Sequence, residues 1–163
     1  MKKFKFSNTS RTRLNTCHHD LIMITELALE LSHCDFGISQ GERTIEQQQQ
    51  YFDDGKSRVN PKRYSSPREL AKRGKHITIK GDPDFSKSRA VDIYAFVKGK
   101  KHLAFDHRTL GVIAGAFFAA AQILFDRGIT SHVIRWGGDW DQDGEIVHDQ
   151  SLVDLPHFEI VKP

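Results

Sequence analysis

The heptapeptide AVDIYAF, residues 90–96, places a carboxylate inside a run of apolar, β-branched and aromatic residues, which is the composition of a buried strand. A second such run, PHFEIV at residues 156–161, carries a histidine near its start. A carboxylate in a buried strand costs several kcal/mol unless it is paired or bound to a cation. Asp92 and His157 are therefore candidates for a chemical role rather than for packing.

Around these two strands the sequence predicts two more strands and three helices. Short apolar runs at residues 36–40 and 133–136 favour the strands. The expected helices are residues 14–33, from the helical spacing of Leu14, Cys17, Leu21, Ile24, Ala28 and Leu31; residues 44–52, from a Thr44 to Gln47 capping box; and residues 110–125, ended by Gly128.

Helices and strands mix without regular βαβ alternation, which predicts an α+β fold. We expect one domain over residues 1–163, with a small, mainly antiparallel sheet packed with helices. A chain of 163 residues with 38% hydrophobic and 28% charged residues is typical of a globular protein. Residues 53–89 are rich in Gly, Pro, Ser, Lys and Asp, so we expect a long loop insertion there, with a short helix after Pro67.

Several protein classes are disfavoured. Two cysteines are too few for a disulfide scaffold, and the polar residues after the first lysines lack the apolar stretch of a secretory signal. Segment 110–125 is shorter than the roughly 20 residues of a spanning helix, so we expect a helix buried on most sides and no membrane insertion. The net charge of +3 would attract polyanions, but basic residues 56–75 hold Tyr64 as their one aromatic, so we expect no nucleic acid partner.

A catalytic zinc site needs three protein ligands and an open position for water. His76, Asp92 and His157 can supply such a set. Each of them alone has an ordinary explanation, since a loop histidine is usually solvated and a strand aspartate can bridge a neighbour. Asp154 lies three residues before His157 and can face the same water as a general base.

Four sequence motifs, in the same order along the chain, resemble those of a known protein family. QGERT (40–44), His76 with AVDIY (90–94), WGGDW (136–140) and DLPHFE (154–159) resemble the D-alanyl-D-alanine carboxypeptidase and endolysin peptidase family. The resemblance is closest to phage endolysins that cleave L-alanyl-D-glutamate bonds, and it spans most of the chain. It implies a Hedgehog/DD-peptidase-like fold, bacterial peptidoglycan as substrate, and a monomer made in the host cytoplasm that reaches the wall after membrane permeabilisation.

The resemblance also implies roles residue by residue. His76, Asp92 and His157 are implied as zinc ligands and Asp154 as general base and then acid. The same resemblance implies Arg43 as a substrate-facing cation that stabilises the developing oxyanion, and Gln40 is a weaker candidate for a second hydrogen bond to substrate.

The chain departs from the family pattern between the first two ligands. Gly74 stands where the family has serine, and the spacing from His76 to Asp92 is longer than usual. An insertion over about residues 79–87 would explain it, and it leaves Asp82 and Asp84 as alternatives to Asp92.

A second metal motif lies downstream. Asp139, Asp141, Asp143 and Gly144 match the opening of a calcium-binding EF-hand loop, but position twelve is Gln150 instead of glutamate, so an acidic turn without metal is the alternative. For the whole chain, the alternatives to an L-alanyl-D-glutamate peptidase are a D-alanyl-D-alanine carboxypeptidase, another stem-peptide endopeptidase, and a non-catalytic, metal-bound module that binds the cell wall.

Overall fold

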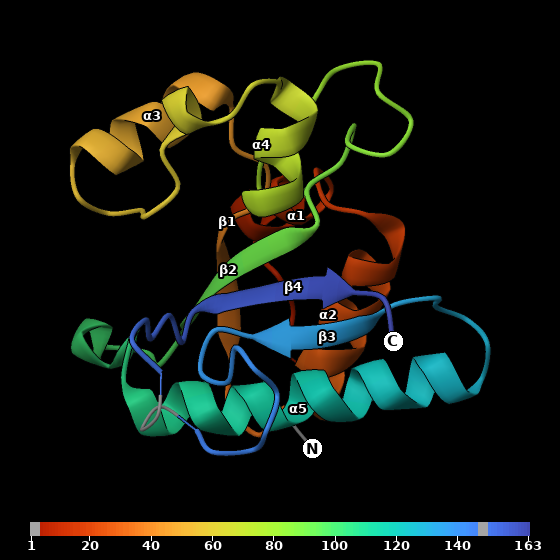
Figure 1. Ribbon diagram of the computed structural model, residues 1–163. Coiled ribbons are helices and arrows are strands. Elements are labelled where there is room, and N and C mark those ends of the chain that lie inside the picture. Colours follow the sequence, from red (N-terminus) through yellow and green to blue (C-terminus); the bar gives the residue numbers. More distant parts are fainter. Residues whose placement is uncertain (1–3, 147–149) are drawn as a thin grey trace.

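The computed structural model describes residues 4–146 and 150–163. Its centre is a four-stranded antiparallel sheet of order β1-β2-β4-β3 (Figure 1). All four strands lie within a residue of their predicted positions, and the α+β prediction is confirmed. Strand β4, the last along the chain, lies in the interior of the sheet. The strands are β1 Phe36–Gln40, β2 Ala90–Ala95, β3 Val133–Trp136 and β4 His157–Val161.

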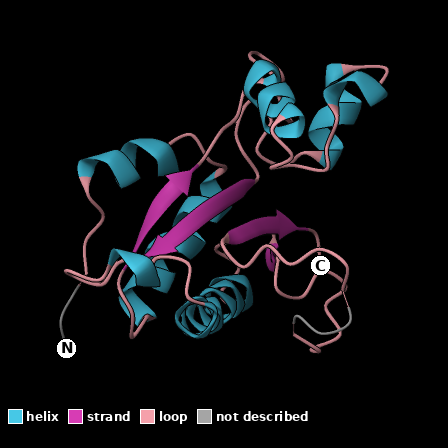
Figure 2. Cartoon of the chain, turned by 90° about the vertical axis from the view of Figure 1, so that its left-hand side faces the viewer, coloured by secondary structure: helices cyan, strands magenta, loops and turns pink. Residues whose placement is uncertain are grey.

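Two long helices cover one face of the sheet. Helices α2 (His19–Leu31) and α5 (His107–Asp126) pack against each other and against the strands, and Figure 2 shows α5 nearly end-on beside the sheet. Phe117 of α5 stacks on Phe158 of β4, with ring centroids 4.0 Å apart. The main hydrophobic core therefore lies between the helices and this face, which leaves the opposite face free for polar side chains.

The single helix expected over residues 14–33 is two helices. Helix α1 (Asn8–Leu14) ends with Asn15 as its C-cap, and His18 caps the start of α2. Between them Cys17 forms a bridge with Ser88, and the backbone N–H of His18 donates to the Ser88 carbonyl at 2.7 Å. The helical spacing was misleading because Leu14 and Cys17 are both buried, although a turn separates them from α2.

Helix α5 differs from the expectation that most of its sides are buried. One face, including Leu110, Ile113 and Phe117, is in the core, whereas Val112 is 50% and Phe118 40% exposed. Its alanines raise the mean hydropathy without requiring burial. Within the described residues α5 is the one helix long and apolar enough to cross a membrane, and its buried face belongs to the core.

Residues 45–89 form a second layer at one end of the sheet (Figure 1). Helix α3 (Ile45–Asp53) begins with the predicted capping box of Thr44 and Gln47. The expected loop contains a 3₁₀ turn, η1 (Pro61–Arg63), and the predicted short helix α4 (Pro67–Arg73); a further turn, η2 (Lys101–Leu103), precedes α5. This layer has a small core of its own, formed by Leu70, Ala71, Ile77 and Phe85.

Candidate metal centre

Strand alternation places Asp92 and His157 on the face of the sheet opposite the helices. The two residues are direct partners in the β2–β4 register, while Val91 and Phe158, one position along, lie in the core. Paired residues in adjacent antiparallel strands point to the same side. The sheet itself therefore brings these two side chains together, and the distance from His157 Nδ1 to Asp92 Oδ1 is 3.0 Å.

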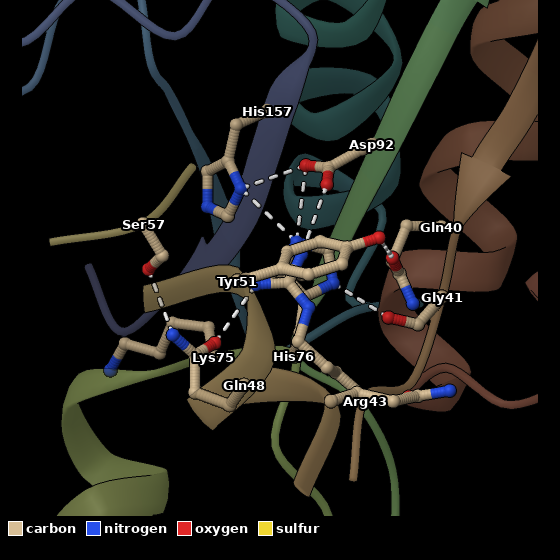
Figure 3. A network of polar contacts seen from close by, with 12 residues as sticks. Gln40, Gly41, Arg43, Gln48, Tyr51, Ser57, Lys75, His76, Asp92 and His157 are labelled. Atoms are coloured by element: carbon tan, nitrogen blue, oxygen red, sulfur yellow. Dashed lines mark hydrogen bonds and ion pairs between the residues drawn. The ribbon is translucent and has the colours of Figure 1, made fainter. Parts of the chain in front are cut away.

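His76 reaches the same point from the segment after α4. Its backbone carbonyl accepts from Arg43 N at 2.8 Å, and its Nδ1 donates to the Gly41 carbonyl at 2.6 Å. Gly41 is needed there because a Cβ at this position would lie 2.2 Å from the Arg13 carbonyl oxygen. Held in this way, His76 Nε2 lies 3.1 Å from Asp92 Oδ1 and 3.2 Å from His157 Nδ1 (Figure 3).

The hydrogen bonds behind the two imidazoles fix which nitrogens face the centre. His76 Nδ1 must carry hydrogen because its partner is a carbonyl, and His157 Nε2 donates to Glu159 Oε2 at 3.0 Å. In the neutral rings the lone pairs of His76 Nε2 and His157 Nδ1 then point at each other and at the Asp92 carboxylate. In that state a cation between them, such as a metal ion, would remove the repulsion among three electron-pair donors this close together.

The dimensions of this triangle fit a metal ion. Zinc ligand bonds of about 2.0 to 2.1 Å in tetrahedral geometry place ligand atoms about 3.3 Å apart. The three separations here are 3.0, 3.1 and 3.2 Å, so only a small expansion is required. The alternative ligands Asp82 and Asp84 lie elsewhere, where both pair with Arg68.

Glu159 supports His157 on the side away from the other two candidate ligands, and it was not among the predicted site residues. It is 3% exposed, and its second carboxylate oxygen accepts from Arg135, whose Nε lies 3.1 Å away. Arg135 in turn stacks over the Trp140 ring at 5.6 Å. Such outer carboxylates orient a ligating histidine and raise its basicity. The alternation of β4, which places Glu159 two residues after His157, is the signal that could have found it.

The electrostatics also favour a cation. Burial lowers the pKa of His157, but hydrogen bonds to Asp92 and Glu159 outweigh burial and raise this pKa to about 10. Burial raises the pKa of Glu159, and the bonds from His157 and Arg135 bring it down to about 2. For Asp92, His76 and His157 overcome burial and hold the pKa well below its usual range. The pocket therefore stabilises positive charge between two ionised carboxylates.

Asp154 lines the same cavity as the three candidate ligands. Its backbone is pinned to the end of β3, since Asp154 N donates to the Gly137 carbonyl at 2.8 Å. A Cβ at Gly137 would lie 2.2 Å from the Asp154 carbonyl oxygen, so only glycine permits this approach. No described residue forms a hydrogen bond with the Asp154 carboxylate. Burial, and then the charge of Asp92, raise the pKa of Asp154.

Arg43 and Gln40 have different surroundings. Arg43 is 8% exposed, lines the cavity, and stacks over the Tyr51 ring at 4.3 Å. One guanidinium nitrogen donates to Gln48 Oε1 at 2.9 Å and another lies 3.6 Å from Asp92 Oδ2. Gln40 is outside the cavity lining, with its amide bonded to the Glu42 carbonyl and the Tyr51 hydroxyl. A substrate contact by Gln40 remains a prediction.

The cavity in front of the centre has a volume of about 820 Å³. The layer of residues 45–89 forms one wall, with Gln48, Tyr51 and Ser57 among the lining residues. Four residues of the basic stretch 56–75 also line it: Lys56, Arg58, Arg73 and Lys75. This grouping depends on how the layer folds back over the sheet, which no local pattern records.

The structure brings together a second polar cluster that sequence patterns do not indicate. Asp20 accepts from Ser131 N at 2.9 Å and from His132 Nδ1 at 2.7 Å, and the His18 ring lies 5.1 Å from the His132 ring. His18 Nδ1 accepts the Asp20 N–H as the cap of α2. The Asp20 carboxylate and the two histidine rings therefore have partners within the cluster. The cluster joins the start of α2 to the segment before β3.

Comparisons with known proteins agree with this geometry. The model of the family Phage L-alanyl-D-glutamate peptidase matches residues 2–161. The L-alanyl-D-glutamate peptidase of Escherichia phage T5 is 32% identical over 161 residues, which cover 97% of this chain and 98% of that protein. The crystal structure of the Serratia marcescens L-Ala D-Glu endopeptidase ChiX has the same fold, with a TM-score of 0.65, 24% identity, and coverage of 98% of this chain and 92% of that one. The chain therefore belongs to the phage L-alanyl-D-glutamate peptidase family.

Proposed function

We propose that the chain is a zinc-dependent peptidase that hydrolyses the L-alanyl-D-glutamate bond in the stem peptide of bacterial peptidoglycan. The observation that carries the proposal is the convergence of His76 Nε2, Asp92 Oδ1 and His157 Nδ1 in front of a cavity that also contains Asp154. Two histidines and one carboxylate are a frequent ligand set of catalytic zinc, and family membership supplies the bond.

A zinc ion in this position would polarise the scissile carbonyl and lower the pKa of a water molecule to about 7. Asp154 then accepts the proton of the attacking water and returns it to the leaving amine. Its carboxylate suits this task for two reasons. No described residue forms a hydrogen bond with it, and its pKa is raised toward neutral pH, which favours proton exchange with water. Arg43 is placed to hold the Asp92 carboxylate and to donate to a substrate oxygen.

Mass spectrometry of digested peptidoglycan tests the bond directly. We expect new fragments that begin with D-glutamate and new stem stubs that end in L-alanine. Release of free D-alanine without these fragments would support a D-alanyl-D-alanine carboxypeptidase instead. Unchanged peptidoglycan, with metal still bound, would support a non-catalytic wall-binding module. We further propose that the enzyme is a monomer made in the host cytoplasm and that it meets the wall once the membrane is permeabilised.

We also propose that calcium binds the loop that begins at Asp139. Carboxylate oxygens of Asp139, Asp141 and Asp143 lie within 4.8 Å of one another, and Asp139 Oδ1 is buried with no hydrogen-bond partner among the described residues. Gly144 has φ of +90°, as a sharp loop turn requires. Trp140, inside the loop, lies 5.3 Å from the His157 ring, so ordering the loop would steady a zinc ligand.

Titration calorimetry with calcium tests this loop. We expect one site with a dissociation constant of about 10⁻⁵ to 10⁻³ M, weak because Gln150 replaces the bidentate glutamate and accepts the Trp140 N–H instead. Asp141→Ala should abolish the heat of binding. Glu145→Ala, which changes a neighbouring acidic side chain outside the carboxylate cluster, is the matched control and should bind calcium normally. Identical heats for wild type and Asp141→Ala would remove the loop from consideration.

A further inference from the structure

The cavity in front of the metal centre has an excess of positive charge. Among the described residues that line it, three are carboxylates, Asp92, Asp154 and Glu159, and two of these belong to the metal centre and its support. A divalent metal would add to the imbalance. A cavity of this kind attracts an anionic ligand. The six cationic lining residues are Arg43, Lys56, Arg58, Arg73, Lys75 and Arg135.

Four of these cations already have partners. The guanidinium of Arg43 is bonded to Gln48 and that of Arg135 to Glu159. Lys56 pairs with Asp54 at 3.0 Å, and Arg58 donates to the Ser151 carbonyl at 3.0 Å. Arg73 and Lys75 remain, and of these Arg73 is exposed whereas Lys75 is half-buried.

The backbone of Lys75 is held in place beside a candidate metal ligand. It directly precedes His76, and its carbonyl accepts from Arg89 N at 2.8 Å and from Ser88 Oγ at 3.4 Å. No described residue forms an ion pair or a side-chain hydrogen bond with its ammonium group. An anion bound in the cavity would give this half-buried ammonium group a partner.

The substrate itself supplies an anion next to the bond that is cut. Glutamate has two carboxyl groups, and only one can continue the peptide, so the residue on the leaving side of the bond retains a free carboxylate. An ammonium group binds a carboxylate through a charge-assisted hydrogen bond, which is stronger than a neutral one. We propose that Lys75 binds this free carboxylate of the D-glutamyl residue and thereby selects the bond that is cut. The inference rests on the proposed function.

Two peptides that differ by one group test the assignment. L-Ala-D-Glu-L-Lys retains the free carboxylate, and the second peptide carries a carboxamide in its place. We expect wild type to prefer the carboxylate peptide in kcat/KM by about tenfold to a hundredfold, the range of a hydrogen bond to a charged group. Lys75→Met should remove the preference by raising KM for the carboxylate peptide alone, with kcat nearly unchanged.

Control variants separate this role from a structural one. Lys75→Arg should keep the preference, and Lys72→Met, an exposed lysine on α4 outside the cavity lining, should behave as wild type. Calorimetry with the product dipeptide D-Glu-L-Lys and its carboxamide should show the same discrimination, and the same loss in Lys75→Met, without turnover. Zinc content and the thermal unfolding temperature of Lys75→Met should match those of wild type. A match excludes a folding defect as the cause of the lost preference.

The outcomes are distinct. Equal cleavage of both peptides by wild type, or a preference that survives in Lys75→Met, would overturn the assignment of Lys75 while leaving the proposed function intact. Failure of wild type to cut either peptide, together with a different bond cut in peptidoglycan, would overturn the proposed function and the assignment with it.

Discussion

Asp154→Asn is expected to lower the rate of peptidoglycan hydrolysis by about 10² to 10⁴, the usual contribution of a general base. Asparagine has nearly the same shape but cannot accept the proton of the attacking water. The fold should persist, because the contact with Gly137 that positions residue 154 is made by its backbone. Zinc should also stay bound, since Asp154 lies outside the triangle of His76, Asp92 and His157. Rates come from the release of soluble peptides, and zinc content from elemental analysis.

A matched variant sharpens this test. Asp126→Asn changes an aspartate at the end of α5, away from the cavity lining, and should leave the rate at the wild-type level. A near-wild-type rate for Asp154→Asn would exclude Asp154 as the base. Loss of zinc together with activity would make it a ligand and would show that the set of three is incomplete.

Removal of a ligand should have the largest effect on metal content. We expect about one zinc per chain in wild type and a nearly complete loss of zinc and activity in His157→Ala, because a three-ligand site reduced to two retains little affinity. His76→Ala and Asp92→Ala should behave in the same way. Elemental analysis after dialysis against a weak chelator measures the loss. Full zinc occupancy in Asp92→Ala would mean that another carboxylate completes the site.

Glu159→Gln should weaken zinc binding without abolishing it. Glutamine can still accept a hydrogen bond from His157 but lacks the charge, so zinc affinity should fall about tenfold to a hundredfold rather than vanish. Competition with a chromophoric chelator measures the dissociation constant for zinc. An affinity equal to that of wild type would show that the Glu159 charge, only 3.0 Å from His157 Nε2, does not support the metal.

Much of the fold and the centre could be predicted where the signal is local. The capping box at Thr44 determines its helix start from four consecutive residues, and alternation in β2 and β4 is visible in the sequence around Asp92 and His157. The strand register, which was not predicted, then brings these two side chains together. Asp92 was predicted as a metal ligand because it is the one charged residue in its strand.

Other features were not predictable because they depend on distant contacts. The break before α2 arises where Cys17 and His18 meet Ser88, far away in the sequence. Helical spacing continues across such a break as long as the residues on both sides are buried. The lack of a partner for the Lys75 ammonium group among the described residues likewise depends on the fold of the layer formed by residues 45–89, and composition records only that the region is basic.

The position of β4 in the sheet has a consequence for when the enzyme becomes active during its synthesis. This strand is the last of the domain to leave the ribosome, yet it must insert between β2 and β3. Until then β2 pairs only with β1, His157 is absent from the centre, and the nascent chain cannot bring the three candidate ligands together. Proteins whose strands pair over long sequence distances also fold slowly. Partly translated chains would therefore lack an assembled centre, and this centre would form as one of the final events of folding.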